Sequence, residues 1–294
     1  MRAVVLAMLA GCYSPSATTG APCDERMVCP SGQVCLAGHC EREGTPVDDA
    51  MIDDGIVDAP DAPPGVWSAP VPVGINVGDS KTDASATPDG LTIVFSRNDD
   101  LFIATRATIG GAFTVLPLPF STPAVSDKGP EIMPDGRTIY FASNPDSDYD
   151  IFMSTFVNGT WQTPVKVAAF AGPSNEQDVA ISPDERTAFV AIGGNIFRST
   201  RADNTAAWPA PASVGVAWGT SPTAPSINAA GDVYFHANNP RDLFVARRTP
   251  QGYAAPVPLT EFNTMTGREA APFVSADDRH IMFERDAELV ESSR

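Results

Sequence analysis

A turn motif recurs five times in this 294-residue chain, and it constrains the fold more than any other feature. Each copy places a tight turn between two apolar runs, as in ATPDGLTIVFS and IMPDGRTIYFAS. Successive copies are 46, 49, 46 and 47 residues apart, and their first turn positions are Pro88, Pro134, Pro183, Ala229 and Ala276. Proline fixes φ and glycine accepts a positive φ, so each copy predicts a β-hairpin.

Two more strands are expected in each repeat. A segment such as DIFMSTF follows every hairpin, and a segment led by an aromatic residue, such as TWQTPVKVA, follows four of them. We interpret the aromatic series as packing of the outer strands; it consists of Trp67, Phe113, Trp161, Trp208 and Tyr253. Four strands per repeat at this period are what a β-propeller blade requires.

The last repeat ends with its third strand, AELVESSR, and has no fourth strand after it. The missing strand lies upstream of the first repeat, at Val66–Val73, because VWSAPVPV has the signature of TWQTPVKV. We therefore predict an all-β, five-bladed propeller over residues 65–294, closed by an N-terminal outer strand that completes the last blade. Closure of the ring would protect both sheet edges from aggregation.

The pattern SPDGxxIxFxS followed by DIxxx resembles the WD40-like (PD40) propeller repeat of TolB-type periplasmic proteins and bacterial surface lipoproteins. The resemblance covers all five repeats. Blade four departs from it at Ala229-Ala230-Gly231, with one residue fewer after the turn, and blade five has Ala276-Asp277-Asp278. These two turns are therefore candidates for a different turn type. The resemblance implies a protein-binding or envelope-associated scaffold, but a fold alone does not determine a function.

Residues 1–11 are typical of a lipoprotein signal peptide. Arg2 precedes a short apolar stretch, and Leu9-Ala10-Gly11-Cys12 resembles the bacterial lipobox, in which Cys12 is acylated. A plain secretory signal with a later cleavage site is the alternative. The sequence contains five cysteines, and assignment of Cys12 to lipid leaves an even number. We expect an outer-membrane lipoprotein that faces the periplasm or the cell surface.

Residues 12–40 form the anchor and a cysteine-rich module. Outside the cytosol, four closely spaced cysteines predict two disulfides, with three possible pairings; they are Cys23, Cys29, Cys35 and Cys40. A zinc site with His39 is the alternative, but it is disfavoured because the C-x2-C spacing of structural zinc sites is absent. Residues 41–64 carry eight acids and one base without a helix or strand period, which predicts a disordered acidic linker.

The net charge of −17 argues against nucleic acid as a partner, because phosphates would be repelled. The sequence holds three histidines and lacks the G-x-S-x-G, H-E-x-x-H and phosphate-loop motifs. One enzymatic alternative remains. Asp83, Glu131 and Asp178 lie on the innermost strands of three successive blades, where a five-bladed glycoside hydrolase would present its carboxylates. The structural alternative is that they bond backbone groups or line a wet channel.

A second acidic set is expected around the mouth of the axial channel. Asp127, Glu176 and Glu269 stand at the entrances of innermost strands, and Asp146 and Asp148 lie in the longest loop expected on the same face. We predict that these five residues form a face that binds a basic partner surface or a cation. Calcium is an alternative for Asp146, Asp148 and Asp150, although no glycine turn or terminal glutamate completes an EF-hand-like loop.

Together these features favour a monomeric, exported binding or scaffold module for a protein or glycan partner at the bacterial envelope. We predict no cofactor, no metal and no catalytic residue as the first interpretation. Contact with the membrane is expected through the lipid anchor alone. Glycoside hydrolysis by the inner-strand carboxylates is the alternative.

Overall fold

The computed structural model describes residues 33–36, 39–42, 65–75, 81–238 and 240–294. The chain divides into two compact units, residues 1–54 and residues 55–294. In the first unit, β1 (Gln33–Leu36) pairs antiparallel with β2 (His39–Arg42), and Cys35 lies opposite Cys40 in the register. The predicted signal peptide, acylated Cys12, Cys23, Cys29, the disulfides and the acidic linker lie outside the described residues. In the described ranges, no helix is long and apolar enough to cross a membrane.

In its described residues, the second unit contains five antiparallel blade sheets, four with four strands and one with five, which are the five predicted blades. In chain order the blades are β4 (Lys81–Ala86), β5 (Thr92–Arg97), β6 (Asp100–Thr105), β7 (Thr114–Pro117); β8 (Asp127–Ile132), β9 (Thr138–Ser143), β10 (Asp150–Val157), β12 (Val165–Lys166); β13 (Glu176–Ile181), β14 (Thr187–Ile192), β15 (Asn195–Thr200), β16 (Ala212–Ser213); β17 (Thr223–Ile227), β18 (Val233–Ala237), β19 (Asp242–Ala246), β22 (Val257–Pro258); and β23 (Glu269–Val274), β24 (His280–Arg285), β25 (Glu288–Ser293), β3 (Val71–Pro72).

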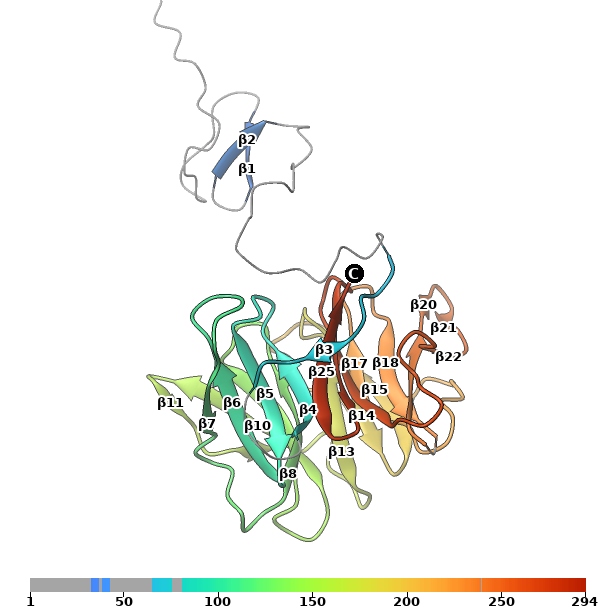
Figure 1. Cartoon of the computed structure of the whole chain (residues 1–294). Helices are drawn as coiled ribbons and strands as arrows, with labels where there is room; N and C mark the ends of the chain where they lie inside the picture. Colours follow the sequence, from blue (N-terminus) through green and yellow to red (C-terminus); the bar gives the residue numbers. More distant parts are fainter. Residues whose placement is uncertain (1–32, 37–38, 43–64, 76–80, 239) are drawn as a thin grey trace, which may run out of the picture. The chain divides into compact units, whose positions relative to one another are not determined.

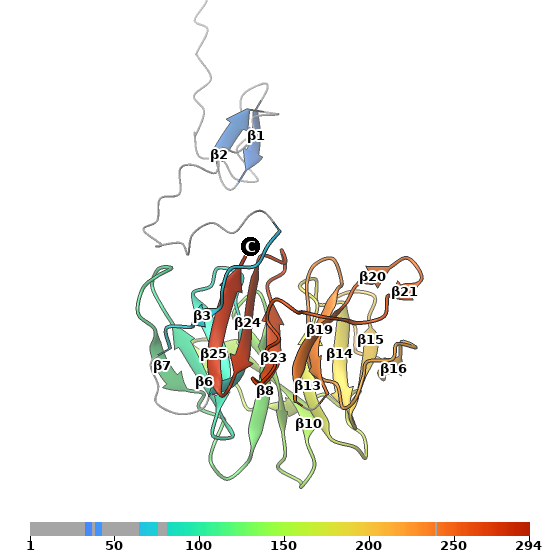
Figure 2. The same ribbon diagram turned by 45° about the vertical axis from the view of Figure 1, so that its right-hand side comes forward.

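The first strand of each blade lies at the centre of the ring. These five strands contact one another in the cyclic order β4, β8, β13, β17, β23 and back to β4. Figures 1 and 2 show the sheets from two directions. Two short strand pairings lie outside this four-strand pattern: β11 (Thr160–Trp161) pairs with β10, and β20 (Arg248–Thr249) pairs with β21 (Gly252–Tyr253). The prediction of an all-β, five-bladed propeller is confirmed.

The last blade closes as predicted. β3 pairs antiparallel with β25, so that Pro72 lies opposite Val290 and Val71 lies opposite Glu291 (Figures 1 and 2). The backbone N–H groups of Ser68 and Val73 extend this pairing by donating to the carbonyls of Ser293 and Leu289, at 2.8 and 3.0 Å. We call this junction the seam. It joins the N-terminal outer strand to the third strand of blade five.

The repeated turns connect the first and second strands of every blade, and we call the end of the ring that carries them the turn face. In blade one, Thr87 Oγ1 donates to Asp89 Oδ1 at 2.6 Å, and the same carboxylate accepts from the N–H of Leu91 at 3.0 Å. The third turn residue has a positive φ in all five blades: Gly90 (61°), Gly136 (66°), Glu185 (55°), Gly231 (86°) and Asp278 (63°). The turns of blades four and five therefore keep this conformation despite their different sequences.

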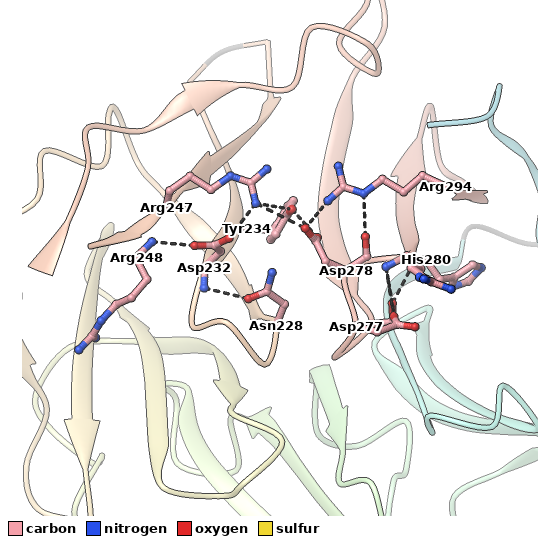
Figure 3. A network of polar contacts seen from close by, with 11 residues as sticks. Asn228, Asp232, Tyr234, Arg247, Arg248, Asp277, Asp278, His280 and Arg294 are labelled. Atoms are coloured by element: carbon pink, nitrogen blue, oxygen red, sulfur yellow. Dashed lines mark hydrogen bonds and ion pairs between the residues drawn. The ribbon is translucent and has the colours of Figure 1, made fainter. Parts of the chain in front are cut away.

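A polar network joins blades four and five at the turn face (Figure 3). Tyr234 donates its hydroxyl to Asp278 Oδ1 at 2.5 Å, and Arg247 Nη1 lies 2.7 Å from Asp232 Oδ2. Arg294 forms an ion pair with Asp278, and its Nε also donates to the carbonyl of Asp278 at 2.7 Å. The Arg294 guanidinium lies over the ring of Trp67 at 4.2 Å. The end of β25 is thereby linked both to a turn and to the N-terminal strand.

This use of arginine recurs around the ring. In blades one and three an arginine at the end of the third strand donates Nε to a turn carbonyl and stacks on the aromatic residue of the outer strand. The pairs are Arg106 with Gly90 O at 2.9 Å and Phe113 at 4.7 Å, and Arg201 with Glu185 O at 2.6 Å and Trp208 at 4.1 Å. Arg248 stacks on Tyr253 at 5.3 Å in blade four, and Phe156 packs on Trp161 at 5.3 Å in blade two. The aromatic series therefore packs against side chains of the ring, as expected.

Candidate functional site

The centre of the ring contains a narrow cavity of about 30 Å³, which we call the waist. All five innermost strands line it, and the three predicted inner-strand carboxylates, Asp83, Glu131 and Asp178, are among its lining residues. The structure therefore brings these three side chains to one place. A cavity of this size has room for one or two water molecules.

A β-bulge in every innermost strand shapes the waist. The register shifts in all five first-to-second strand pairs. The residue five positions before the turn has a positive φ in four blades: Asp83 (45°), Gly129 (57°), Ala224 (47°) and Ala271 (47°). At Gly129 a Cβ atom would lie 2.6 Å from Asp178 Oδ1, so that only glycine fits beside this carboxylate.

Asp178 is buried and linked to the next blade. Its Oδ2 accepts hydrogen bonds from Thr223 Oγ1 and from the N–H of Ala224, the latter at 3.2 Å. Burial, together with the negative charge of Asp83, raises the pKa of Asp178 to about 7. Burial also raises the pKa of Asp83, against the opposing charge of Lys128. Two of the three carboxyls are thus electrostatic neighbours.

Glu131 also bonds to a neighbouring blade. Ser85 Oγ accepts from the N–H of Ile132 at 2.8 Å, and Ser226 Oγ accepts from the N–H of Val274 at 2.9 Å, each from the following blade. Glu131 occupies the same repeat position, three residues before the turn, and its carboxyl accepts from the backbone of Ile181. Burial raises its pKa to about 8. The carboxyl therefore takes the part that a serine hydroxyl has in two other blades.

These contacts limit the chemistry of the waist. A sugar-binding cleft needs a volume of several hundred Å³, about ten times what the waist offers. Asp178 accepts from the Thr223 hydroxyl and the N–H of Ala224, and Glu131 accepts from the backbone of Ile181, in each case from an adjacent blade. This arrangement is the structural alternative that the sequence left open. A catalytic role for Asp83, Glu131 and Asp178 stays a hypothesis, and the waist is too small to hold a glycoside.

The entrances of the innermost strands differ from the acidic mouth that we expected. Glu176 and Glu269 are fully buried, and Asp127 is 3% exposed. Ser121 Oγ donates to Asp127 Oδ2 at 2.6 Å, and Arg285 Nε lies 3.2 Å from Glu269 Oε1. These three carboxyl groups pack inside the ring and do not form an exposed binding face.

Asp146 and Asp148 remain accessible at the loop between β9 and β10. The Asp146 side chain is 74% exposed and lies 3.7 Å from Lys166 Nζ, which also contacts the buried Asp150 at 2.5 Å. The ammonium group of Lys166 therefore already contacts two of the three alternating aspartates, Asp146 and Asp150. Throughout the described ranges, no group of three or more His, Cys, Asp or Glu side chains is placed to hold a metal ion. A binding role for Asp146 and Asp148 stays a prediction.

A larger cavity opens at the turn face, directly next to the waist. This vestibule measures about 220 Å³ and shares Glu131 and Phe273 with the waist. Every blade contributes to its mostly apolar wall, which includes Ala86, Pro88, Ile132, Met133, Pro134, Ile181, Pro183, Ile227, Phe273, Val274 and Ala276. The repeat pattern did not predict this vestibule, although the apolar residue two positions before each turn belongs to that pattern.

Replacement of Glu131 tests whether its carboxyl group is protonated in the folded protein at neutral pH. With a pKa near 8, native Glu131 retains a proton between pH 4.5 and 8 that the unfolded chain releases, so that stability falls as pH rises through this window. Glu131→Gln should remove roughly 2 kcal/mol of that fall, a figure discounted for partial exposure. Urea unfolding at pH 5, 7 and 8.5 measures the slope. An unchanged slope in Glu131→Gln, with exposed Glu288→Gln as the control, would contradict the assignment.

Comparisons with known proteins identify the fold. No family model matches the chain, and no curated protein sequence matches it. Among solved structures, the PQQ-bound aldose sugar dehydrogenase of Streptomyces coelicolor is 15% identical, with a TM-score of 0.50 over 79% of this chain and 99% of that one. TolB from Acinetobacter baumannii is 12% identical, with a TM-score of 0.47 over 74% of this chain and 55% of that one. A putative TolB from Agrobacterium tumefaciens is 13% identical, with a TM-score of 0.47 over 70% and 69%. At these identities the similarity concerns the fold alone.

Proposed function

We propose that this chain is an exported, lipid-anchored binding module of the WD40-like repeat class, and that its vestibule receives a segment of a protein partner at the bacterial envelope. The observation that carries the proposal is the apolar, open cavity at the turn face, walled by all five blades. Desolvation of an apolar side chain in such a cavity contributes about 1.5–3 kcal/mol, enough to anchor a segment.

The chemistry of the vestibule favours a protein segment over a glycan. Its wall consists mainly of proline, isoleucine, valine and alanine side chains, and Phe273 is its one aromatic residue among those described. Sugars need several hydrogen-bonding groups in addition to an aromatic surface, because each buried hydroxyl that lacks a partner costs free energy. Leucine, isoleucine or methionine would meet no such cost here.

The location rests on the sequence. Leu9-Ala10-Gly11-Cys12 matches the lipobox pattern and supports acylation of Cys12. Replacement of Cys12 by Ser should move the chain from the membrane fraction to the soluble fraction after cell lysis. Unchanged membrane association would refute the anchor but leave the vestibule proposal intact.

Site-specific photocrosslinking in intact cells tests the vestibule. A photoreactive residue at exposed Pro134 should capture a discrete partner, whereas one at exposed Glu288 should not capture it. Ala276→Phe, which places a ring in the vestibule, should reduce the Pro134 crosslink by tenfold or more without a change in melting temperature. A crosslink that persists in Ala276→Phe would overturn the proposal.

A further inference from the structure

The vestibule lies at the junction of two larger openings on the turn face. A groove of about 400 Å³ between blades three and four shares Pro183 and Ile227 with it, and a cleft of about 450 Å³ between blades five and one shares Ala86 and Pro88. An apolar side chain in the vestibule can therefore belong to a longer polypeptide whose flanking residues lie over the turns. The charge of the turns decides which flanking residues fit.

Four of the five turns carry a carboxylate at their second position, beside the vestibule. These turn carboxylates are Asp89, Asp135, Asp184 and Asp277. Asp277 lines the vestibule itself, Asp184 lines the groove, and Asp89 lines the cleft. Asp135 follows Pro134, which is part of the vestibule wall.

The turn carboxylates are held in place by hydrogen bonds, and Arg137, Arg186 and Arg279 follow three of them by two residues. Their hydrogen bonds come from within the turn, for example from Ser182 Oγ to Asp184 Oδ1 at 2.5 Å and from Ser275 Oγ to Asp277 Oδ1 at 2.6 Å. The Thr87 and Ser182 hydroxyls lower the pKa of Asp89 and Asp184, so both stay ionised. Within the described chain, none of the four forms an ion pair within 4 Å.

Blade four breaks the ring of charge. Its shortened turn places Ala230 where the other blades have aspartate, and Asn228 Oδ1 accepts from the N–H of Asp232 at 2.9 Å in place of the usual Ser/Thr–Asp pair. The groove opens on this side and is lined by Arg248 and Tyr253. A carboxylate therefore lies beside the apolar cavity at four of the five turns, while Arg106 lines the cleft and Arg248 lines the groove.

We infer that the partner segment is basic: one apolar side chain enters the vestibule, and lysine or arginine residues beside it pair with the turn carboxylates. This inference rests on the proposed function and specifies its ligand. An acidic segment would bring like charges together around an apolar contact and be disfavoured. The side without a carboxylate, over blade four, gives the segment an exit where its charge need not be positive.

Three short peptides test the charge and the apolar contact separately. The probes are the capped, fluorescently labelled pentapeptides Lys-Lys-Leu-Lys-Lys, Glu-Glu-Leu-Glu-Glu and Lys-Lys-Ser-Lys-Lys, titrated with the full chain at 50 mM salt. The first should bind at least tenfold more tightly than the second, and 300 mM salt should weaken it several-fold because exposed charges are screened. The serine peptide should bind at least fivefold more weakly than the leucine peptide.

Two substitutions in the turns move affinity in opposite directions. Asp184→Asn keeps the acceptor for Ser182 and should weaken Lys-Lys-Leu-Lys-Lys about two- to fivefold, the range for one exposed ion pair. Ala230→Asp supplies the missing carboxylate and should strengthen it by a similar factor. Glu288→Gln, an exposed acid at the start of β25, is the matched control and should leave affinity unchanged. Asp146→Asn tests the second predicted acidic site, on the opposite face.

The outcomes separate the two proposals. Equal binding of the lysine and glutamate peptides, or no effect of Asp184→Asn and Ala230→Asp, would overturn the basic segment while the Pro134 crosslink could still stand. Equal binding of the leucine and serine peptides would refute entry into the vestibule, and with it the proposed function. A loss of affinity with Asp146→Asn alone would assign the cationic ligand to the other face and overturn the inference.

Discussion

Deletion of residues 66–73 is expected to abolish cooperative folding of the propeller. The segment contributes Trp67 and Val73 to two of the core clusters, and both side chains are at least 91% buried. Removal of a buried tryptophan alone costs about 3–5 kcal/mol. The deletion also removes the strand that covers β25 and the stacking partner of Arg294. Since domains of this kind have about 5–15 kcal/mol of stability, most of it would be lost.

Circular dichroism and thermal unfolding measure the effect, and two other variants of the chain serve as controls. A chain that starts at Gly65 should melt as the full chain does, because the seam is intact. The second control is a permuted chain in which residues 65–74 follow Arg294. The linker is a copy of residues 201–207, which lie between the third and fourth strands of blade three. This chain should recover a cooperative transition. Cooperative unfolding of the deletion at the normal temperature would show that the seam does not close the ring.

The sequence was sufficient for the architecture because each blade repeats the same local chemistry. The recurring turns and the aromatic position of each outer strand define the register of every repeat. The fifth blade was then the one that lacked an outer strand, and VWSAPVPV was the one segment with that signature still unassigned. The pairing of β3 with β25 shows that a strand missing from one repeat of a closed array predicts where a distant segment must pair. Nothing comparable existed for the cysteine module or the acidic linker, where no repeat fixes a register.

The acidic mouth could not be predicted correctly because the innermost strands are bulged. Alternation of side chains along a regular strand places residue i and residue i+2 on one face, and a bulge interrupts that rule. Between Lys128 and Glu131 the register shifts, so the direction of the Asp127 side chain could not be read from the pattern closer to the turn. Local sequence carried no signal for the bulge other than Gly129, whose positive φ is one of four at that position.

The vestibule was missed for a different reason. Its residues come from five positions about 47 residues apart, and each belongs to a pattern that already had an explanation as strand or turn. An apolar residue two positions before a turn is ordinary packing in a single hairpin. It becomes a cavity wall only when five hairpins surround one axis, which is a property of the ring.

Removal of the positive charge of Arg285, beside Glu269, is expected to lower the free energy of unfolding strongly. The Glu269 carboxyl has no exposed surface, and Arg285 Nε lies 3.2 Å from its Oε1. Thr264 supplies two further donors, Oγ1 at 3.0 Å and its backbone N–H at 3.2 Å. Arg285→Met keeps an unbranched, mainly apolar stem and removes the guanidinium charge. It should cost about 3 kcal/mol, the lower end of the range for breaking a buried ion pair, because Arg285 is partly exposed.

A double-mutant cycle measured by urea unfolding isolates this ion pair. Glu269→Gln removes the buried charge and keeps one acceptor oxygen for the backbone N–H of Thr264, while its amide can donate to Thr264 Oγ1. Glu269→Gln/Arg285→Met should therefore be more stable than Arg285→Met alone by about 1 kcal/mol or more, by the logic of coupling between contacting residues. Gly267 belongs to the same cluster, because a Cβ there would lie 2.8 Å from Glu269 Oε1. If the double variant is no more stable than Arg285→Met, the lost stability comes from the packing of Arg285 on Phe283 and its bond to Phe262 O, and the buried charge is not the cause.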